Sequence, residues 1–155
     1  MQCKLDLEIS DSQFGLRSRP CADEELQWGE GNCAQGLLLL SGVVMFDPLS
    51  DEQFGADVIV RTAEKFLPSK SAQRCVQVPF EVVDPAELAV FSPCEELQVK
   101  LDVVPGDYTL IYEVCLGKEV YYVLTLLKGR IEQPTALKSD GWGMEKGVPL
   151  LSGIA

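Results

Sequence analysis

Apolar and polar residues alternate along much of this chain, with the two-residue period of half-buried β-strands. The clearest example is residues 108–127, where two alternating runs are separated by a reversal at Gly117-Lys118. Residues 97–103 alternate in the same way, and the turn sequence Pro105-Gly106-Asp107 follows them. We therefore predict a meander of three strands over residues 97–127. Its apolar face requires a second layer to cover it.

Other segments also predict strands. Residues 36–46 are apolar almost throughout, which predicts one strand buried on both faces, with a bulge or kink at Ser41-Gly42. Pro79 lacks an amide donor, so we expect its strand to pair on one side only at that point. The remaining predicted strands cover residues 3–9, 56–61, 73–83 and 88–92.

Two stretches have no sustained period. Residues 13–36 predict a long ordered loop, with one helical turn near residues 24–28 that Asp23 caps. After Leu127 the chain becomes rich in glycine, with five glycines and two prolines, and only residues 148–151 resemble a strand. We predict a β-domain over residues 1–127 and a C-terminal extension over 128–155 that is packed on it or partly disordered.

The predicted elements amount to about eight strands separated by turns, with few or no long helices. This pattern is typical of an all-β protein, an antiparallel β-sandwich. A barrel is the alternative, because closure also removes sheet edges.

The sequence lacks the residues that several classes of enzyme and metal site require. The chain has no histidine, which removes the usual general base and the usual metal ligand. Its six cysteines form no CxxC pair, and we expect them to be free thiols. No phosphate-binding, dinucleotide-binding or hydrolase motif is present. We therefore predict a protein that is not an enzyme and that has no cofactor and no metal.

Acidic residues dominate the charge, with a formal net charge of −11. Between residues 20 and 60 there are eight acids and no base, whereas a short basic island lies between Arg61 and Arg74. This balance argues against nucleic-acid binding, and either maintains solubility or attracts a basic partner such as a nuclease or toxin domain. Trp28 either covers an open end of the core or anchors such a partner. The candidate partner-binding residues are Asp23, Glu24, Glu25, Trp28, Glu30, Asp51, Glu52 and Asp57.

A ligand- or calcium-binding β-sandwich is the alternative function. Asp47, Asp51, Glu52 and Asp57 are close enough in sequence to bind Ca²⁺ from loops, although their spacing does not match an EF-hand. The longest apolar run, residues 37–40, is too short for a membrane span, and the N-terminal residues contain no apolar signal region. These two observations predict a cytoplasmic protein.

A series of short motifs adds a family resemblance. In chain order they are LEISDSQF at 7–14, Trp28 followed by AQG at 34–36, an apolar strand ending at Phe46, VQVPFEV at 76–82 and VPGDYTLIYE at 104–113. Their order over residues 5–115 resembles the ComJ family, the competence-associated inhibitors of a secreted DNA-entry nuclease, and related immunity-type proteins. The resemblance implies a small β protein that binds a nuclease one-to-one and blocks it without catalysis.

Overall fold

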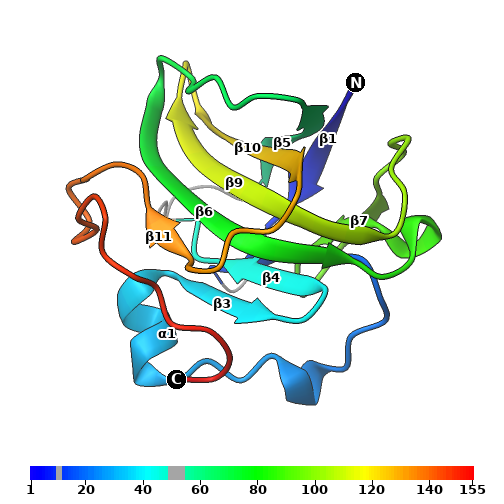
Figure 1. Cartoon of the computed structure of the whole chain (residues 1–155), viewed down its shortest axis with the longest axis horizontal. Helices are drawn as coiled ribbons and strands as arrows, with labels where there is room; N and C mark the ends of the chain where they lie inside the picture. The colour runs from blue at the N-terminus through cyan, green and yellow to red at the C-terminus, as the bar shows by residue number, and fades with distance from the viewer. Residues whose placement is uncertain (10–11, 49–54) are drawn as a thin grey trace.

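The computed structural model describes residues 1–9, 12–48 and 55–155. Within these residues two sheets pack face to face (Figure 1). The six-stranded sheet contains, in spatial order, β1 (Gln2–Glu8), β5 (Gly55–Ala63), β10 (Val120–Lys128), β9 (Gly106–Leu116), β6 (Ala72–Val82) and β11 (Thr135–Ala136). The five-stranded sheet contains β3 (Leu37–Leu40), β4 (Val43–Phe46), β2 (Phe14–Arg17), β7 (Ala89–Phe91) and β8 (Glu96–Gln98).

Helices are short in the described part of the chain. They are α1 (Glu30–Gln35) and the 3₁₀ turns η1 (Asp23–Glu25) and η2 (Pro85–Glu87). Every strand pair is antiparallel except β5 and β10. The prediction of an all-β, sandwich-like fold without long helices is therefore confirmed.

The core lies between the inner faces of the two sheets and contains a cluster of four aromatic rings. Phe46 stacks on Tyr112 at a centroid distance of 4.0 Å, and Phe14 lies 4.8 Å from Tyr122. The Tyr122 hydroxyl donates to the carbonyl of Pro48 at 2.9 Å, which satisfies its polar end inside the core. Burial raises the pKa of both tyrosines, because the charged phenolate would lose its hydration in the core.

The apolar run at residues 36–46 forms two strands, so the prediction of one strand was wrong. β3 and β4 pair directly, Leu40 with Val43, and the chain reverses at Ser41-Gly42. Gly42 has φ 71°, a left-handed conformation that glycine adopts without strain. The expected burial of both faces is nevertheless present, because the outward-facing Leu38 and Met45 are as buried as the core.

Residues 13–36 are not one long loop, as we had predicted. They contain β2, which pairs with β4 and β7 at the centre of the smaller sheet, and α1, which ends at Gly36 in the left-handed conformation. The expected helical turn is η1, and its N-cap is Ala22 rather than Asp23.

The predicted three-strand meander is correct only for β9 and β10. Residues 99–105 form no strand, and β8 belongs to the other sheet, where it pairs with β7. The alternation there still reflects burial, since Val99 is buried and its amide donates to the Leu88 carbonyl at 2.8 Å. Pro79 pairs with Thr109 of β9 while β11 pairs only with residues 76 and 77, which confirms one-sided pairing at the proline.

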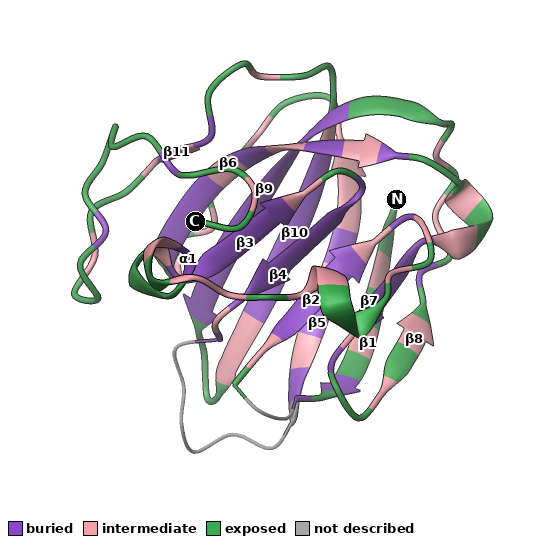
Figure 2. Cartoon of the chain, turned by 90° about the horizontal axis from the view of Figure 1, so that it is seen from below, coloured by how far each residue is buried: buried purple, intermediate pink, exposed green. Residues whose placement is uncertain are grey.

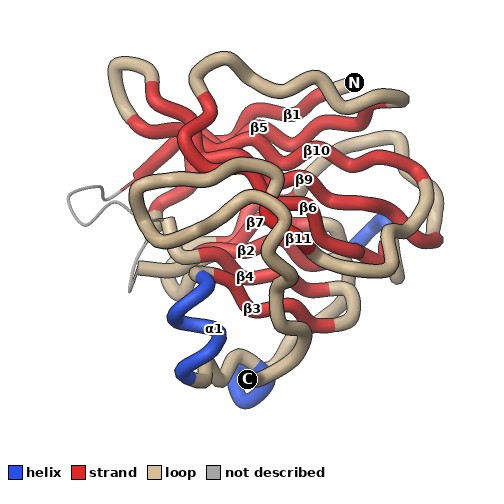
Figure 3. Tube along the Cα trace, turned by 60° about the vertical axis from the view of Figure 1, so that its left-hand side comes forward, coloured by secondary structure: helices blue, strands red, loops and turns tan. Residues whose placement is uncertain are grey.

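The C-terminal extension, residues 128–155, runs along the β6 side of the larger sheet and the β3 edge of the smaller one to α1 (Figure 3). β11 joins β6, and the only bridge at 148–151 links Pro149 to Thr135, so the strand suggested there is absent. Near its end, the Gly153 amide donates to the Leu39 carbonyl at 2.7 Å, so the extension lines the free edge of β3.

Candidate partner-binding surface

The acidic segment 19–30 crosses the outer face of the five-stranded sheet (Figure 2). In β4, residues 44 and 46 enter the core, whereas Val43 and Met45 face outward and are nevertheless buried. The outer face of the sheet is therefore apolar and needs a cover, which the segment provides. Arg19 attaches the segment to the sheet, because its Nε donates to the Ser41 carbonyl at 2.7 Å. The sequence therefore places acids over an apolar sheet face that must be covered.

Glu25 holds this segment in shape. Its carboxylate accepts from the Arg19 guanidinium at 3.0 Å and from the Ala22 amide at 3.0 Å. The hydrogen bond from Arg19 is the main reason that the pKa of Glu25 is lowered. Asp23 and Glu24 are exposed beside it and remain available to a partner.

A hollow of about 260 Å³ lies next to these acids, between the segment and the sheet. Asp23 and Leu26 form one side, and Met45 and Phe91 contribute apolar surface. An acidic rim beside an apolar floor can accept a basic side chain together with its aliphatic stem.

Trp28 and Glu30 lie at the other end of the segment. Trp28 is half-buried, and its indole Nε1 donates to Gln13 Oε1 at 3.1 Å, so the ring is fixed and partly open to solvent. Glu30 is exposed as the first residue of α1.

The remaining predicted residues are not part of this surface. Asp57 lies on β5 between the inward-facing residues Ala56 and Val58, so it points from the outer face of the six-stranded sheet. There it pairs with Lys4 at 3.2 Å. Asp51 and Glu52 lie outside the described residues. The structure thus brings Asp23, Glu24, Glu25, Trp28 and Glu30 together, and places Asp57 on the opposite side of the molecule.

A second acidic group on the smaller sheet was missed from sequence. Arg17 projects from the outer face of β2 and forms ion pairs with Glu87, at 2.9 Å, and with Glu96. Both carboxylates remain partly exposed, and a further hollow lies around them. The sequence offers one signal for this group, nine acids against two lysines between residues 75 and 119. The strand pairing that assembles the group is not visible in the sequence.

Glu113 and Arg74 are charged groups that the sequence pattern places on strands but that the fold buries. Glu113 is fully buried on the outer face of β9, where it accepts from the amide and the hydroxyl of Ser69 at 2.9 and 3.1 Å. Arg74 binds Asp140 of the C-terminal extension. Glu113 thus holds the loop at Ser69, and Arg74 holds the loop that contains Asp140.

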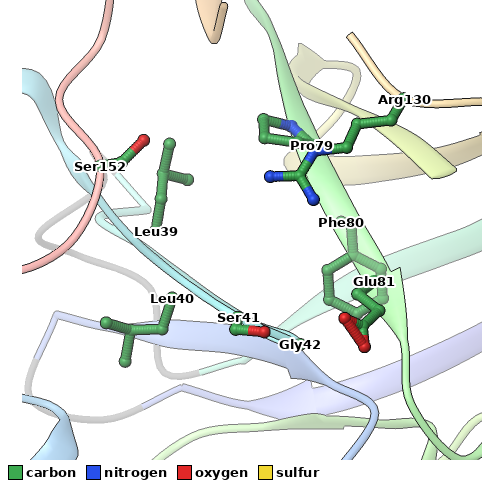
Figure 4. Close-up of a pocket in the computed structure, with 9 residues that line it drawn as sticks. All are labelled: Leu39, Leu40, Ser41, Gly42, Pro79, Phe80, Glu81, Arg130 and Ser152. Atoms are coloured by element: carbon green, nitrogen blue, oxygen red, sulfur yellow. The ribbon is translucent and has the colours of Figure 1, made fainter. Parts of the chain in front are cut away.

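The hollow shown in Figure 4 lies where the β3–β4 turn approaches β6. Ser41 and Gly42 line one side, Phe80 and Glu81 the other, and Arg130 of the extension closes it. Its volume of about 160 Å³ is below the roughly 300–1,000 Å³ of ordinary ligand sites. It is too small to hold more than a small polar group.

Residues 1–9, 12–48 and 55–155 contain no group of three or more side chains suited to hold a metal ion. Of the calcium candidates, Asp47 follows β4 of the smaller sheet and Asp57 lies on the outer face of β5 in the larger one, and the other two lie outside these ranges. All six cysteines are unpaired thiols, and burial raises the pKa of Cys75 to about 12. Among the described residues, no helix is long and apolar enough to cross a membrane.

Comparison with known proteins identifies the family. The model of the family described as Competence protein J (ComJ) matches residues 6–127, well over half of the chain. The chain belongs to the ComJ family. The match ends at the last residues of β10, so the C-terminal extension lies outside the ComJ model.

Two solved structures share the fold. ComJ from Bacillus subtilis, an inhibitor of the DNA degrading activity of NucA, matches with a TM-score of 0.64 and 20% identity, over 81% of this chain and 94% of that one. The product of crocagin biosynthetic gene J matches with a TM-score of 0.53 and 13% identity, over 84% and 98%. A search of curated proteins found no match.

Proposed function

We propose that this protein is a non-catalytic inhibitor that binds a DNA-degrading nuclease and blocks it. The observation that carries the proposal is membership of the ComJ family, together with a structural relative that inhibits the DNA degrading activity of NucA. The absence of histidine from the whole chain is consistent with a binding role.

The surface around segment 19–30 is the proposed contact. A nuclease presents cationic groups to the phosphates of DNA, and carboxylates on an inhibitor can occupy the same groups. Asp23, Glu24 and Glu30 are exposed there and Trp28 is partly exposed. Trp28 would supply the aromatic contact that interface centres favour. Glu25 supports the segment from within, and Asp57 lies outside this footprint.

Charge also gives the proposal a kinetic signature. A body with a net charge of −11 attracts a basic nuclease over distance, which raises the association rate at low salt. We place this action in the cytoplasm, because six unpaired cysteines fit a reducing compartment.

The test is a titration of the purified chain into NucA during DNA cleavage, and into the NucA-like nuclease of the organism that encodes this chain. We expect activity to fall to a low plateau near one equivalent of inhibitor with at least one of them. Undiminished cleavage by both nucleases at a large excess would contradict the proposal.

A further inference from the structure

A groove of about 390 Å³ separates α1 from the C-terminal extension. Gly31, Ala34 and Gln35 form its α1 wall, and residues 143–145 and 148–151 form the opposite wall. One wall thus comes from the part of the chain that matches the ComJ model, and the other from the part beyond it.

Hydrogen bonds fix both walls. Gln35 Nε2 donates to the Leu151 carbonyl at 2.9 Å, and the Leu151 amide donates to Gln35 Oε1 at 2.7 Å. At the far end, the Asp140 carboxylate accepts from the amides of Trp142 and Met144 at 2.8 and 3.3 Å. The groove is therefore preformed, and a partner that enters it loses little free energy to ordering this chain.

Apolar side chains remain open to solvent along the extension. Val148 and Leu151 line the groove with 43% and 51% of their surface exposed, and Trp142, next to Gly143 of the wall, is 47% exposed. Large apolar groups held open in a rigid concave surface are typical of partner-binding sites.

Charge indicates which partner fits. Glu145 lines the groove on one wall, and the exposed Glu30 adjoins Gly31 on the other. Carboxylates on both sides of an apolar floor favour an apolar side chain flanked by lysine or arginine. They disfavour a second copy of this chain, which would bring like charges together. Glu30 also belongs to the acidic surface, so the groove continues that surface across α1.

We propose that this groove is the second half of the nuclease contact and takes an apolar side chain from a basic segment of the nuclease. The inference rests on the proposed function. In it, the acids of segment 19–30 steer the nuclease toward the inhibitor, and the groove slows its dissociation.

The test compares full-length variants against whichever of the two nucleases the wild type inhibits. Leu151→Asp and Ala34→Arg change exposed side chains without removing the Leu151 backbone hydrogen bonds. Each should raise the inhibition constant about tenfold or more, mainly through faster dissociation. The control Leu67→Asp, at a position 76% exposed on another loop, should change it less than twofold.

The outcomes separate the two proposals. If the wild type inhibits neither nuclease, the proposed function fails and the groove proposal fails with it. If the wild type inhibits while Leu151→Asp and Ala34→Arg match it, only the groove proposal fails. Hydrogen exchange provides a second measurement: the amides of residues 148–152 should be protected in the complex, and unchanged exchange would overturn the inference. A Leu151-dependent dimer of the free chain in sedimentation would assign the groove to a second copy instead.

Discussion

The Arg74 guanidinium and the Asp140 carboxylate form an ion pair, 2.7 Å from Nε to Oδ2, with both side chains almost completely buried. Arg74 lies on β6, and Asp140 lies in the extension, beyond the part of the chain that matches the ComJ model. The same guanidinium lies 5.8 Å from the centroid of the Trp142 ring. We propose that residues 1–127 form the domain and that this pair fastens the extension to it.

Breaking the pair should destabilise the protein strongly. Asp140→Ala leaves the buried guanidinium without its anion, and we expect a loss of about 3–5 kcal/mol in the free energy of unfolding. Urea denaturation of this variant and of Glu132→Ala, an exposed acid in the same extension, measures the difference. Equal stability of the two variants would show that the pair does not hold the extension.

Acid should weaken the same contact. Burial acts to raise the pKa of Asp140, but hydrogen bonds and charge from Arg74, with two backbone amides, outweigh it, and the pKa is lowered. A carboxyl with a lowered pKa in the folded state stabilises the protein fully above its unfolded pKa, about 3.8. That stability disappears as the pH falls through the folded value. Stability measured between pH 5 and 2 should therefore fall less in Asp140→Asn than in the wild type.

Asn32 should be a second attachment point for the extension. Its buried side chain accepts from the amides of Gly29 and Ala155, both at 2.9 Å, and donates to the Gly153 carbonyl at 2.9 Å. Asn32→Leu removes all three bonds, which should lower stability by about 1–3 kcal/mol and speed proteolysis after residue 150. The control is Cys33→Ser, at the exposed neighbouring position. Proteolysis at the same rate in both variants would show that Asn32 does not hold the extension.

A substitution at Glu113 should change stability without changing nuclease binding. Glu113→Ala leaves the partly buried Ser69 amide and hydroxyl without their acceptor, so thermal unfolding should shift by the equivalent of about 1–3 kcal/mol. Because Glu113 lies on the outer face of the larger sheet, nuclease inhibition should be unchanged below the unfolding temperature. Glu119→Ala, at an exposed turn, is the control for stability. If folded Glu113→Ala lost inhibition, the nuclease contact would lie on the six-stranded sheet, which contradicts the proposed surface.

Burial was predictable from sequence wherever alternation is regular. In the predicted strand 73–83, the alternate positions Val76, Val78 and Phe80 share one face, and all three are in the core. Residues 99–103 show the limit of this rule, because side chains can alternate in burial while the backbone pairs with no neighbouring strand. β2 was missed because it is short and contains Gly15. A Cβ at Gly15 would lie 2.5 Å from the Val44 carbonyl oxygen, so close packing requires the residue that interrupts the pattern.

The candidate surface was only partly predictable for a related reason. A run of acids indicates charge but not the sheet face that carries it, and β5 carries Asp57 away from Asp23. Glu25 shows a second difficulty. The sequence does not distinguish Glu25 from its neighbour Glu24, and only the structure shows that Arg19 binds Glu25. The acidic group around Arg17 depends on pairing between β2, β7 and β8, which are distant in sequence.

Charge reversal should separate steering from contact. The double variant Asp23→Lys with Glu24→Lys should slow nuclease association by about tenfold at low salt and much less at high salt. The control double variant Asp6→Lys with Glu8→Lys changes two exposed acids of β1, on the opposite face, by the same total charge and should have a smaller effect. Stopped-flow association rates measured over a range of salt concentrations decide this, and equal slowing by both variants would indicate net charge rather than a defined surface.

The most direct test of nuclease inhibition is the DNA cleavage rate of NucA, and of the NucA-like nuclease from the organism that encodes this chain, at rising concentrations of the purified wild-type chain. We predict that cleavage by at least one of them stops near one inhibitor per nuclease at low salt, and that added DNA competes with the inhibitor. Cleavage that continues unchanged with both nucleases at a hundredfold excess of the chain would contradict the account.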